Sequence, residues 1–362
     1  MKGLCYLKPG VIKLQEVPKP KIIEPTDVIG KVIMTTICGS DIHIIKGELD
    51  FITKNVEETG RGVVLGHEGI IEVEQVGSAV KNLRPKDVCI MSCISCCGKC
   101  HYCKEGCPAH CLNSVGICGC YIGSMIDGAQ AEYVRVPYAD HSLYKCPEGV
   151  PLSSSLMLSD ILPTSYELGV LNGNVKEGST VAIVGVGPIG LAALLSAKAM
   201  KPAYIVAIDL DDTRLEKAKS LGADYTVNSG KTDVIKFINE LPSIDGRLPG
   251  MNTAIECVGS PATFELCQEI VGVNGTVANV GIHGKSAKAL IDKLWIMNVN
   301  ITTGVVNCTS TKELMSRMIK GELDPSKLIT HHFKLSEIEE AYKVFSNAAE
   351  SKAIKIIIDN DY

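Results

Sequence analysis

The sequence contains no long hydrophobic run, no cluster of basic residues and no internal repeat. A membrane-spanning helix needs about eighteen or more consecutive apolar residues, and no such stretch occurs. The first ten residues, MKGLCYLKPG, lack a sustained apolar core followed by a small-residue cleavage site, so they do not resemble a secretory signal. We therefore expect a cytoplasmic protein without a membrane partner.

The charge balance argues against a second class of protein. The net charge is −5 and the basic residues are scattered, so the electrostatic footprint of a nucleic-acid-binding surface is missing. Hydrophobic residues make up 46% of the chain and charged residues 21%, which is ordinary for a globular protein. At 362 residues the chain is long enough for two domains, each with its own core.

The chain has two parts with different sequence patterns. The first 150 residues carry short apolar segments broken by glycine, proline and aspartate, which predicts a domain rich in small strands. From about Ser153 onward, strand and helix patterns alternate, as in a doubly wound parallel sheet. The expected strands are Val28 to Met34, Gly69 to Val76 and Val88 to Met91 in the first part, and Val181 to Val184, Tyr204 to Ile208, Thr253 to Cys257, Thr276 to Val280 and Asn300 to Thr303 in the second.

The last segment has two helical patterns, Lys312 to Ile319 and Leu335 to Ala348, and one strand, Ala353 to Ile358. It is too short to form a domain alone, so we expect it to pack back on the first part. The predicted organisation is a β-rich domain formed by residues 1–155 and completed by residues 305–362, with an α/β domain of residues 156–304 between them.

A glycine-rich turn lies where the first strand of the α/β domain should pass into a helix. Its sequence is Gly185-Val-Gly187-Pro188-Ile189-Gly190, the G-x-G-x-x-G pattern of dinucleotide-binding sites. The first glycine allows a tight turn, the second lets the backbone approach a pyrophosphate, and the third lets helix and strand pack closely. Pro188 suits the first helical position, and the helix N-terminus favours phosphate. Glycine-rich turns of this kind also occur without a ligand.

The next strand ends in Asp209, where a carboxylate can accept hydrogen bonds from an adenosine ribose. Asp211 and Asp212 follow closely, and like charges disfavour the 2′-phosphate of NADP. Arg214 offsets part of this repulsion. We therefore expect the chain to bind NAD in preference to NADP.

Sixteen cysteines are present, and ten of them lie between Cys89 and Cys120. This clustering favours a metal site over a spread disulfide framework. Cys97, Cys100, Cys103 and Cys111 offer four thiolates in one loop, which predicts a closed, structural zinc site. Three further thiols compete for this role, namely Cys93, Cys96 and Cys107. The alternative is a loop of reduced, buried cysteines.

A second set of metal-binding side chains is spread over two segments, Cys38-Gly-Ser40-Asp-Ile-His43 and Gly66-His67-Glu68. A catalytic zinc keeps one position open and takes about three protein ligands, and a thiolate with an imidazole suits it. Taken separately, a lone cysteine is more often a small buried hydrophobe. A lone histidine is likewise more often a structural residue than a ligand.

Together these motifs resemble the zinc-dependent medium-chain alcohol dehydrogenases, closest to their microbial secondary-alcohol branch. The resemblance spans nearly the whole chain and includes Glu256-Cys-Val-Gly259. It implies a GroES-like catalytic domain with an inserted Rossmann domain, two zinc ions per chain, and a homodimer or homotetramer. Cys38 and His67 match catalytic zinc ligands, and Glu68 matches a carboxylate that can exchange onto the metal. Ser40 and His43 match a relay that carries the alcohol proton to solvent, although a capped turn after a strand would explain both.

The chain departs from many members at the third catalytic ligand. They carry cysteine or glutamate there, whereas this chain has Ser159-Asp160, as in the secondary-alcohol branch. Asp160 lies in the apolar run Leu156 to Leu162, which we expect to be helical after a cap at Ser153 to Ser155. A carboxylate in such a run is costly to bury unless it is paired or binds a metal. Otherwise Asp160 turns to solvent or caps the next turn at Pro163-Thr164.

The resemblance implies reversible hydride transfer between a small alcohol, with a secondary alcohol favoured, and NAD. In such enzymes zinc acts as a Lewis acid on the hydroxyl, and the cofactor carries the redox chemistry. A polyol dehydrogenase is the closest enzymatic alternative. A zinc-free quinone reductase would lack the set Cys38, His67 and Asp160. A non-enzymatic nucleotide-binding sensor would need no open metal site.

Overall fold

A computed structural model describes residues 1–114 and 121–361. The chain divides into two compact units. The first contains Met1–Asp160, Asn307–Ile319 and Ile329–Tyr362, and the second contains Ile161–Val306 and Lys320–Leu328. Compared with the division expected from the sequence, residues 156–160 lie in the first unit, and Lys320–Leu328 lie in the second.

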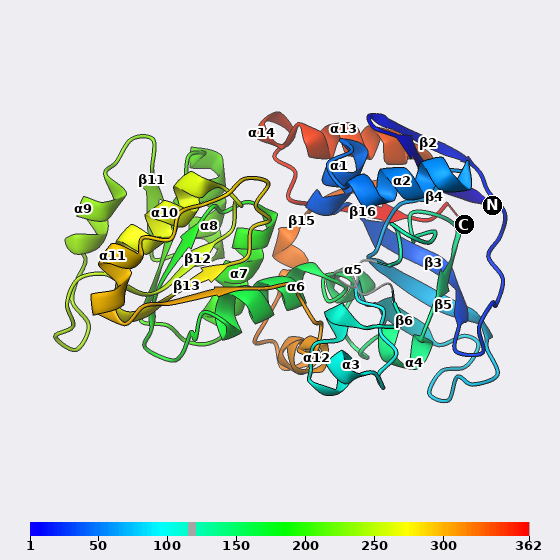
Figure 1. Ribbon diagram of the computed structural model, residues 1–362, viewed down its shortest axis with the longest axis horizontal. Helices are drawn as coiled ribbons and strands as arrows, with labels where there is room; N and C mark the ends of the chain where they lie inside the picture. Colours follow the sequence, from blue (N-terminus) through cyan, green and yellow to red (C-terminus); the bar gives the residue numbers. More distant parts are fainter. Residues whose placement is uncertain (115–120, 362) are drawn as a thin grey trace. The chain divides into compact units, whose positions relative to one another are not determined.

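The first unit is built on β-structure (Figure 1). Its larger sheet has the order β15-β16-β3-β5-β6-β8, and β7 also pairs with β3. A smaller sheet has the order β2-β1-β4. The strands are β1 Lys2–Lys8, β2 Val11–Glu16, β3 Val28–Thr36, β4 Val63–Val64, β5 Gly69–Val76, β6 Val88–Met91, β7 Tyr133–Val136, β8 Leu143–Lys145, β15 Ile329–Lys334 and β16 Lys355–Asp359.

Short helices complete the first unit: α1 Gly39–Ile45, α2 Asp50–Thr59, α3 His101–Lys104, α4 Ala139–Ser142, α5 Leu152–Leu156, α12 Thr311–Ile319, α13 Ile338–Ser346 and α14 Ala348–Ser351. One buried cluster joins Leu4 and Tyr6 of β1 to Ile338 and Tyr342 of α13 and to Ile356 of β16. The C-terminal segment is therefore part of the core that begins with the first strand.

The second unit contains a six-stranded parallel sheet with the order β11-β10-β9-β12-β13-β14. Counted along the chain from β9, this is the order 3-2-1-4-5-6 of a doubly wound dinucleotide-binding fold. Its strands are β9 Thr180–Val184, β10 Tyr204–Asp209, β11 Tyr225–Asn228, β12 Met251–Glu256, β13 Val271–Asn279 and β14 Asn300–Thr303, and its main helices are α6 Ile161–Thr164, α7 Pro188–Lys198, α8 Asp212–Leu221, α9 Val234–Asn239, α10 Pro261–Ile270 and α11 Ile291–Leu294. The predicted α/β fold class is confirmed.

The apolar patterning explains why these segments become central strands. Every residue of β9 is buried, as expected for a parallel strand covered on both faces. Helix α8 begins where the Asp211 side chain accepts hydrogen bonds from the Thr213 and Arg214 N–H groups, and it ends at Gly222 in a left-handed conformation. Among the described helices, none has both the length and the apolar character required to cross a membrane.

Candidate functional site

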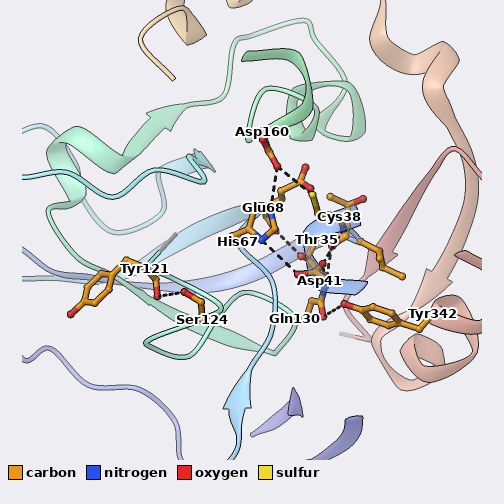
Figure 2. A network of polar contacts seen from close by, with 12 residues as sticks. Thr35, Cys38, Asp41, His67, Glu68, Tyr121, Ser124, Gln130, Asp160 and Tyr342 are labelled. Carbon is orange, nitrogen blue, oxygen red and sulfur yellow. Dashed lines mark hydrogen bonds and ion pairs between the residues drawn. The ribbon is translucent and has the colours of Figure 1, made fainter. Parts of the chain in front are cut away.

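Four side chains that can ligate a metal converge in the first unit (Figure 2). Cys38 caps the N-terminus of α1, His67 and Glu68 lie directly before β5, and Asp160 lies in a turn after α5. One ligand atom from each lies within 4.8 Å of the others. The Asp160 Oδ2 atom is 3.2 Å from His67 Nε2 and 3.5 Å from Cys38 Sγ. The structure thus brings together residues that are far apart in the sequence.

The electrostatics of this group suit a divalent cation. Burial raises the pKa of the Cys38 thiol, and the Asp160 carboxylate raises it further. Burial alone would lower the pKa of His67, but its contacts with Asp160 and Cys38 hold that pKa well above its usual value. Burial, with the nearby carboxylates adding to it, therefore favours the protonated form of the thiol. A zinc ion would replace these protons, and a thiolate, an imidazole and carboxylates are ligands that zinc accepts.

Lys355 of β16 lies against the same group and was not identified from the sequence. Its Nζ atom donates hydrogen bonds to Glu68 Oε1 at 2.9 Å, to Glu68 Oε2 at 3.2 Å and to the Ile37 carbonyl at 3.2 Å. Lys355 is 2% exposed and Glu68 is 1% exposed. The only available signal was a single charge within the apolar run Ala353 to Ile358. A buried ammonium requires a partner, and this partner is Glu68.

Asp41 of α1 is a second residue that was missed. Its Oδ2 atom accepts a hydrogen bond from the Cys38 N–H at 2.9 Å, and its Oδ1 atom lies 3.6 Å from His67 Nδ1. Asp41 therefore contacts two of the candidate ligands from the side away from Asp160. A carboxylate next to a ligating histidine fixes which ring nitrogen carries the hydrogen.

The sequence analysis predicted that the run from Leu156 to Leu162 is helical, and the structure shows that this prediction is wrong at Asp160. Helix α5 ends at Leu156, and residues 157–160 form a turn. Ser153 to Ser155 lie inside α5, whose N-cap is Pro151. Because the chain turns at Asp160, its carboxylate is free to face Cys38 and His67 instead of following a helical face.

Ser40 and His43, the predicted relay residues, both lie on α1. Ser40 is partly buried. The His43 side chain is 42% exposed, and its Nδ1 atom lies 2.5 Å from Glu48 Oε2. His43 therefore has a carboxylate partner and access to solvent.

The thiols of Cys97, Cys100, Cys103 and Cys111 form a second group, with all four sulfurs within 4.8 Å of one another. The Asn113 amide donates to Cys97 Sγ at 3.2 Å, and the Cys97 N–H donates to Cys111 Sγ at 3.3 Å. Burial would raise the pKa of Cys97, but the Lys99 N–H and the Asn113 amide lower it to about 6. Such donors stabilise thiolates, which are the form that binds zinc.

The three competing thiols are not members of this group. Cys93 instead lies beside Cys308, with 3.5 Å between the two sulfurs. Cys96 is buried and Cys107 is half-buried. Only the set with the expected spacing therefore presents four thiols to one point among the residues that the structure describes.

The glycine-rich turn of the second unit joins β9 to α7. Gly185 has a φ of 89°, which favours glycine. A Cβ atom on Gly190 would lie 1.9 Å from the Gly185 carbonyl oxygen, so helix and strand pack closely there. Gly187 precedes α7, Pro188 is its first residue and Ile189 its second. The structure thus has the tight turn and the close packing of helix on strand that the glycine-rich pattern predicts.

Asp209 closes this turn at the end of β10. Its Oδ2 atom accepts a hydrogen bond from the Val186 N–H at 2.8 Å, and its Oδ1 atom accepts from Leu210 and Asp211 at 2.8 and 3.0 Å. The Arg214 guanidinium lies near the turn, with Nη1 3.9 Å from the position that a Cβ on Gly187 would occupy. Acidic and basic groups therefore flank the predicted phosphate site.

Comparisons with known proteins agree with this arrangement. Residues 24–148 match the model of the alcohol dehydrogenase GroES-like domain, and residues 188–320 match that of the zinc-binding dehydrogenases. An alcohol dehydrogenase of Cupriavidus necator is 33% identical over 99% of this chain and 98% of its own length. The structure resembles zinc dependent alcohol dehydrogenase 2 from Streptococcus pneumonia in its apo form, with a TM-score of 0.89, 49% identity and coverage of 100% of this chain and 99% of that one.

A second similar structure contains a cofactor. It is described as a short chain alcohol dehydrogenase from E. coli CFT073 complexed with NADH, with a TM-score of 0.86, 25% identity and 99% coverage of both chains. The expected oxidoreductase class is confirmed. The chain, with its GroES-like and Rossmann-type folds, therefore belongs to the zinc-dependent medium-chain alcohol dehydrogenases.

Proposed function

We propose that this alcohol dehydrogenase interconverts a secondary alcohol and its ketone with NAD as coenzyme. In this proposal Cys38, His67 and Asp160 hold a catalytic zinc ion, with Glu68 as an exchangeable carboxylate. The four thiolates of the Cys97 to Cys111 loop hold a structural zinc ion. The observation that carries the proposal is the convergence of one thiol, one imidazole and two carboxylates within 4.8 Å.

Zinc in this group would supply Lewis-acid activation of the alcohol hydroxyl. The protein's own residues would orient the alcohol and carry its proton to solvent. Three protein ligands leave room for a substrate oxygen, because zinc favours four ligands. Lys355 donates hydrogen bonds to both carboxylate oxygens of Glu68. In this proposal Glu68 is therefore not one of the three resting ligands, but it can exchange onto the metal.

In this proposal Ser40 and His43 relay the alcohol proton to solvent. His43 is suited to this task because an imidazole nitrogen can accept a proton and then donate it. Its contact with Glu48 stabilises the charged imidazolium once the proton arrives. Its partial exposure allows the proton to pass to water. The prediction is that His43→Gln lowers turnover in alcohol oxidation while zinc content stays unchanged, because the side chain that passes the proton to water is lost.

The preference for secondary alcohols is supported by Asp160, the residue in which the chain resembles the secondary-alcohol branch. The test is kcat/KM for matched primary alcohols, secondary alcohols and polyols, with chiral analysis of the reduced ketones and zinc measured per chain. The proposal expects the secondary alcohols to be the best substrates. Higher kcat/KM for polyols would favour the polyol alternative, and the best turnover with primary alcohols would contradict the proposal.

The preference for NAD over NADP is supported by charge. Asp209 lies at the turn, and Asp212 begins the following helix, so a 2′-phosphate would meet negative charge. An unpaired like-charge contact costs several kcal/mol. Asp209→Asn removes the charge while retaining one acceptor oxygen for the turn, and it should raise NADP use relative to NAD by about tenfold or more. Equal efficiency of the unmodified enzyme with both coenzymes would contradict the proposal.

We further propose that the protein is a cytoplasmic homodimer or homotetramer. Strand β14 forms one edge of the six-stranded sheet, and the nearby Trp295 and Ile296 are 68% and 70% exposed. Exposed edges and apolar side chains favour association. None of the cysteines that the structure describes forms a disulfide, which suits a reducing compartment. Light scattering of the purified enzyme tests the assembly, and a monomer at micromolar concentration would contradict it.

A further inference from the structure

Behind Asp41 lies a chain of buried polar side chains that the proposed reaction does not use (Figure 2). The Tyr342 hydroxyl donates to Gln130 Oε1 at 2.9 Å. Gln130 Nε2 in turn donates to Asp41 Oδ2 and to the Thr36 carbonyl, both at 3.2 Å. Gln130 is completely buried and Tyr342 is 4% exposed.

The hydrogen bonds fix the direction of this chain. Gln130 has an amide oxygen that accepts and an amide nitrogen that donates, and both are used here. Burial raises the pKa of Tyr342 well above its usual value, and Asp41 adds to this, so the hydroxyl remains a neutral donor. With Tyr342 donating to Oε1, the Gln130 nitrogen faces the Asp41 carboxylate. The reverse orientation would place an amide oxygen against that carboxylate.

We propose that Gln130 and Tyr342 are positioning residues that hold the Asp41 carboxylate in the orientation required for metal binding by Cys38 and His67. This inference rests on the proposed catalytic zinc. It assigns a role in the metal site to α13, whose Tyr342 lies far from the ligands in the sequence.

The two oxygens of Asp41 show how the positioning works. Oδ2 is held by the Cys38 N–H and by Gln130. Oδ1 is buried and has no hydrogen-bond partner among the described residues, while His67 Nδ1 lies 3.6 Å from it. A metal bound at Nε2 leaves the ring hydrogen on Nδ1, directed at Oδ1. Gln130 helps to fix Oδ2 of Asp41, so it also determines where Oδ1 of Asp41 lies relative to the His67 ring.

The matched test compares two variants with two controls. Gln130→Met removes the amide and keeps the volume, and Tyr342→Phe removes only the hydroxyl. The controls are Asn360→Leu and Tyr6→Phe. Asn360 is a buried amide that donates to the Val32 and Ala131 carbonyls, and the buried Tyr6 hydroxyl contacts Thr53 Oγ1 at 2.8 Å.

The measurements are the Kd for Zn²⁺ by competition with a chelator, and the visible absorption of the Co²⁺-substituted full-length enzyme. The cobalt bands that are absent in Asp160→Ala belong to the catalytic group. Gln130→Met should raise the Kd at this group about 10- to 100-fold and shift its bands. Tyr342→Phe should produce a smaller change in the same direction. The control variants should lower Tm without altering the Kd or the bands.

Unchanged metal affinity and cobalt bands in Tyr342→Phe and Gln130→Met, with stability losses like those of the controls, would overturn the inference. If Gln130→Met does not fold, the metal affinity and cobalt bands of Tyr342→Phe decide whether the inference holds. A different outcome identifies failure of the proposed function: the unmodified enzyme would then bind no metal at the Cys38 group, whatever the variants do.

Discussion

At the scale of single residues, Lys355 is the side chain whose loss the structure predicts to be most costly. Replacing it with methionine would leave the Glu68 carboxylate buried without its cation. Breaking a buried ion pair from one side costs about 3–5 kcal/mol. We therefore expect Lys355→Met to lower the free energy of unfolding by about this amount, measured by urea denaturation.

The control for this variant is Lys343→Met, since Lys343 is paired with Glu340 on the surface. It should produce little measurable change because exposed pairs contribute little. The double variant Lys355→Met with Glu68→Gln should recover part of the stability, because no buried charge is then left unpaired. A loss in Lys355→Met no greater than that of Lys343→Met would show that the buried pair is not important for stability.

Asp160 provides the second prediction at this scale. Its Oδ2 atom contacts both Cys38 and His67, so Asp160→Ala removes the group that joins them. We expect the variant to lose one zinc per chain and to lose dehydrogenase activity. The two remaining ligands, Cys38 and His67, bind zinc less tightly than three ligands do. Zinc analysis, turnover and NAD titration measure this. A variant with two zinc ions and near-normal turnover would exclude Asp160 as a ligand.

At the scale of elements, the packing of α7 against β9 depends on Gly190. An added methyl group would meet the Gly185 carbonyl at 1.9 Å, so the helix would have to move away from the strand. Overpacking of this kind costs about 1–3 kcal/mol. We expect Gly190→Ala to destabilise the protein by this amount and to raise the Kd for NAD, because a displaced α7 no longer holds its N-terminal N–H groups at the predicted pyrophosphate position.

The control is Gly284→Ala, which adds the same methyl group where no atom lies within 4 Å. Gly284→Ala should change neither the stability of the protein nor its Kd for NAD appreciably. Calorimetry and fluorescence titration with NADH distinguish the two variants. Normal NADH binding by Gly190→Ala would contradict the role given to the close packing of α7 and β9.

Elements with strong apolar patterns were predictable from the sequence, and weakly patterned ones were not. Strands β5 and β6 occupy the predicted residues, because apolar runs bounded by turn residues define them. Strand β14 also occupies the predicted residues, although it reads NITT and none of its residues is buried. Strand β11, which reads YTVN, was missed because polar side chains interrupt its pattern and only one of its residues is buried. Strand β15, which reads ITHHFK, was missed because half of its residues are exposed and polar side chains interrupt its pattern.

The candidate metal-binding residues were identifiable from the sequence, whereas their hydrogen-bond partners were not. Cysteine and histidine are common metal ligands, and the spacing of the loop thiols and the motifs around Cys38 and His67 indicated that role. Asp41, Gln130 and Lys355 are common polar residues whose role depends on which segments fold together. Gln130, for example, meets Asp41 and Tyr342 only after β3, β7 and α13 have assembled into one unit.

At the scale of the whole molecule, both candidate metal-binding groups lie in the first unit, and the glycine-rich turn lies in the second. Loss of the thiolate-bound zinc should therefore destabilise the first unit and leave the fold of the second intact. A metal present at 1,000 times its Kd stabilises the folded state by about 4 kcal/mol. At about 2–4 °C per kcal/mol, its loss should lower the Tm of the first unit by about 10 °C.

Cys100→Ala tests this division because it removes one thiol from the structural group and leaves the Cys38 group unaltered. Hydrogen exchange should show faster exchange around α3 and β6, while amides of β9 and α7 remain protected and gain protection when NADH is added. Zinc content should fall by one per chain, and activity should persist below the new Tm. Equal loss of protection in both units would show that the two units unfold together and that the thiolate site stabilises the whole chain. Unchanged Tm and zinc content would exclude a structural zinc ion in the Cys97 to Cys111 loop.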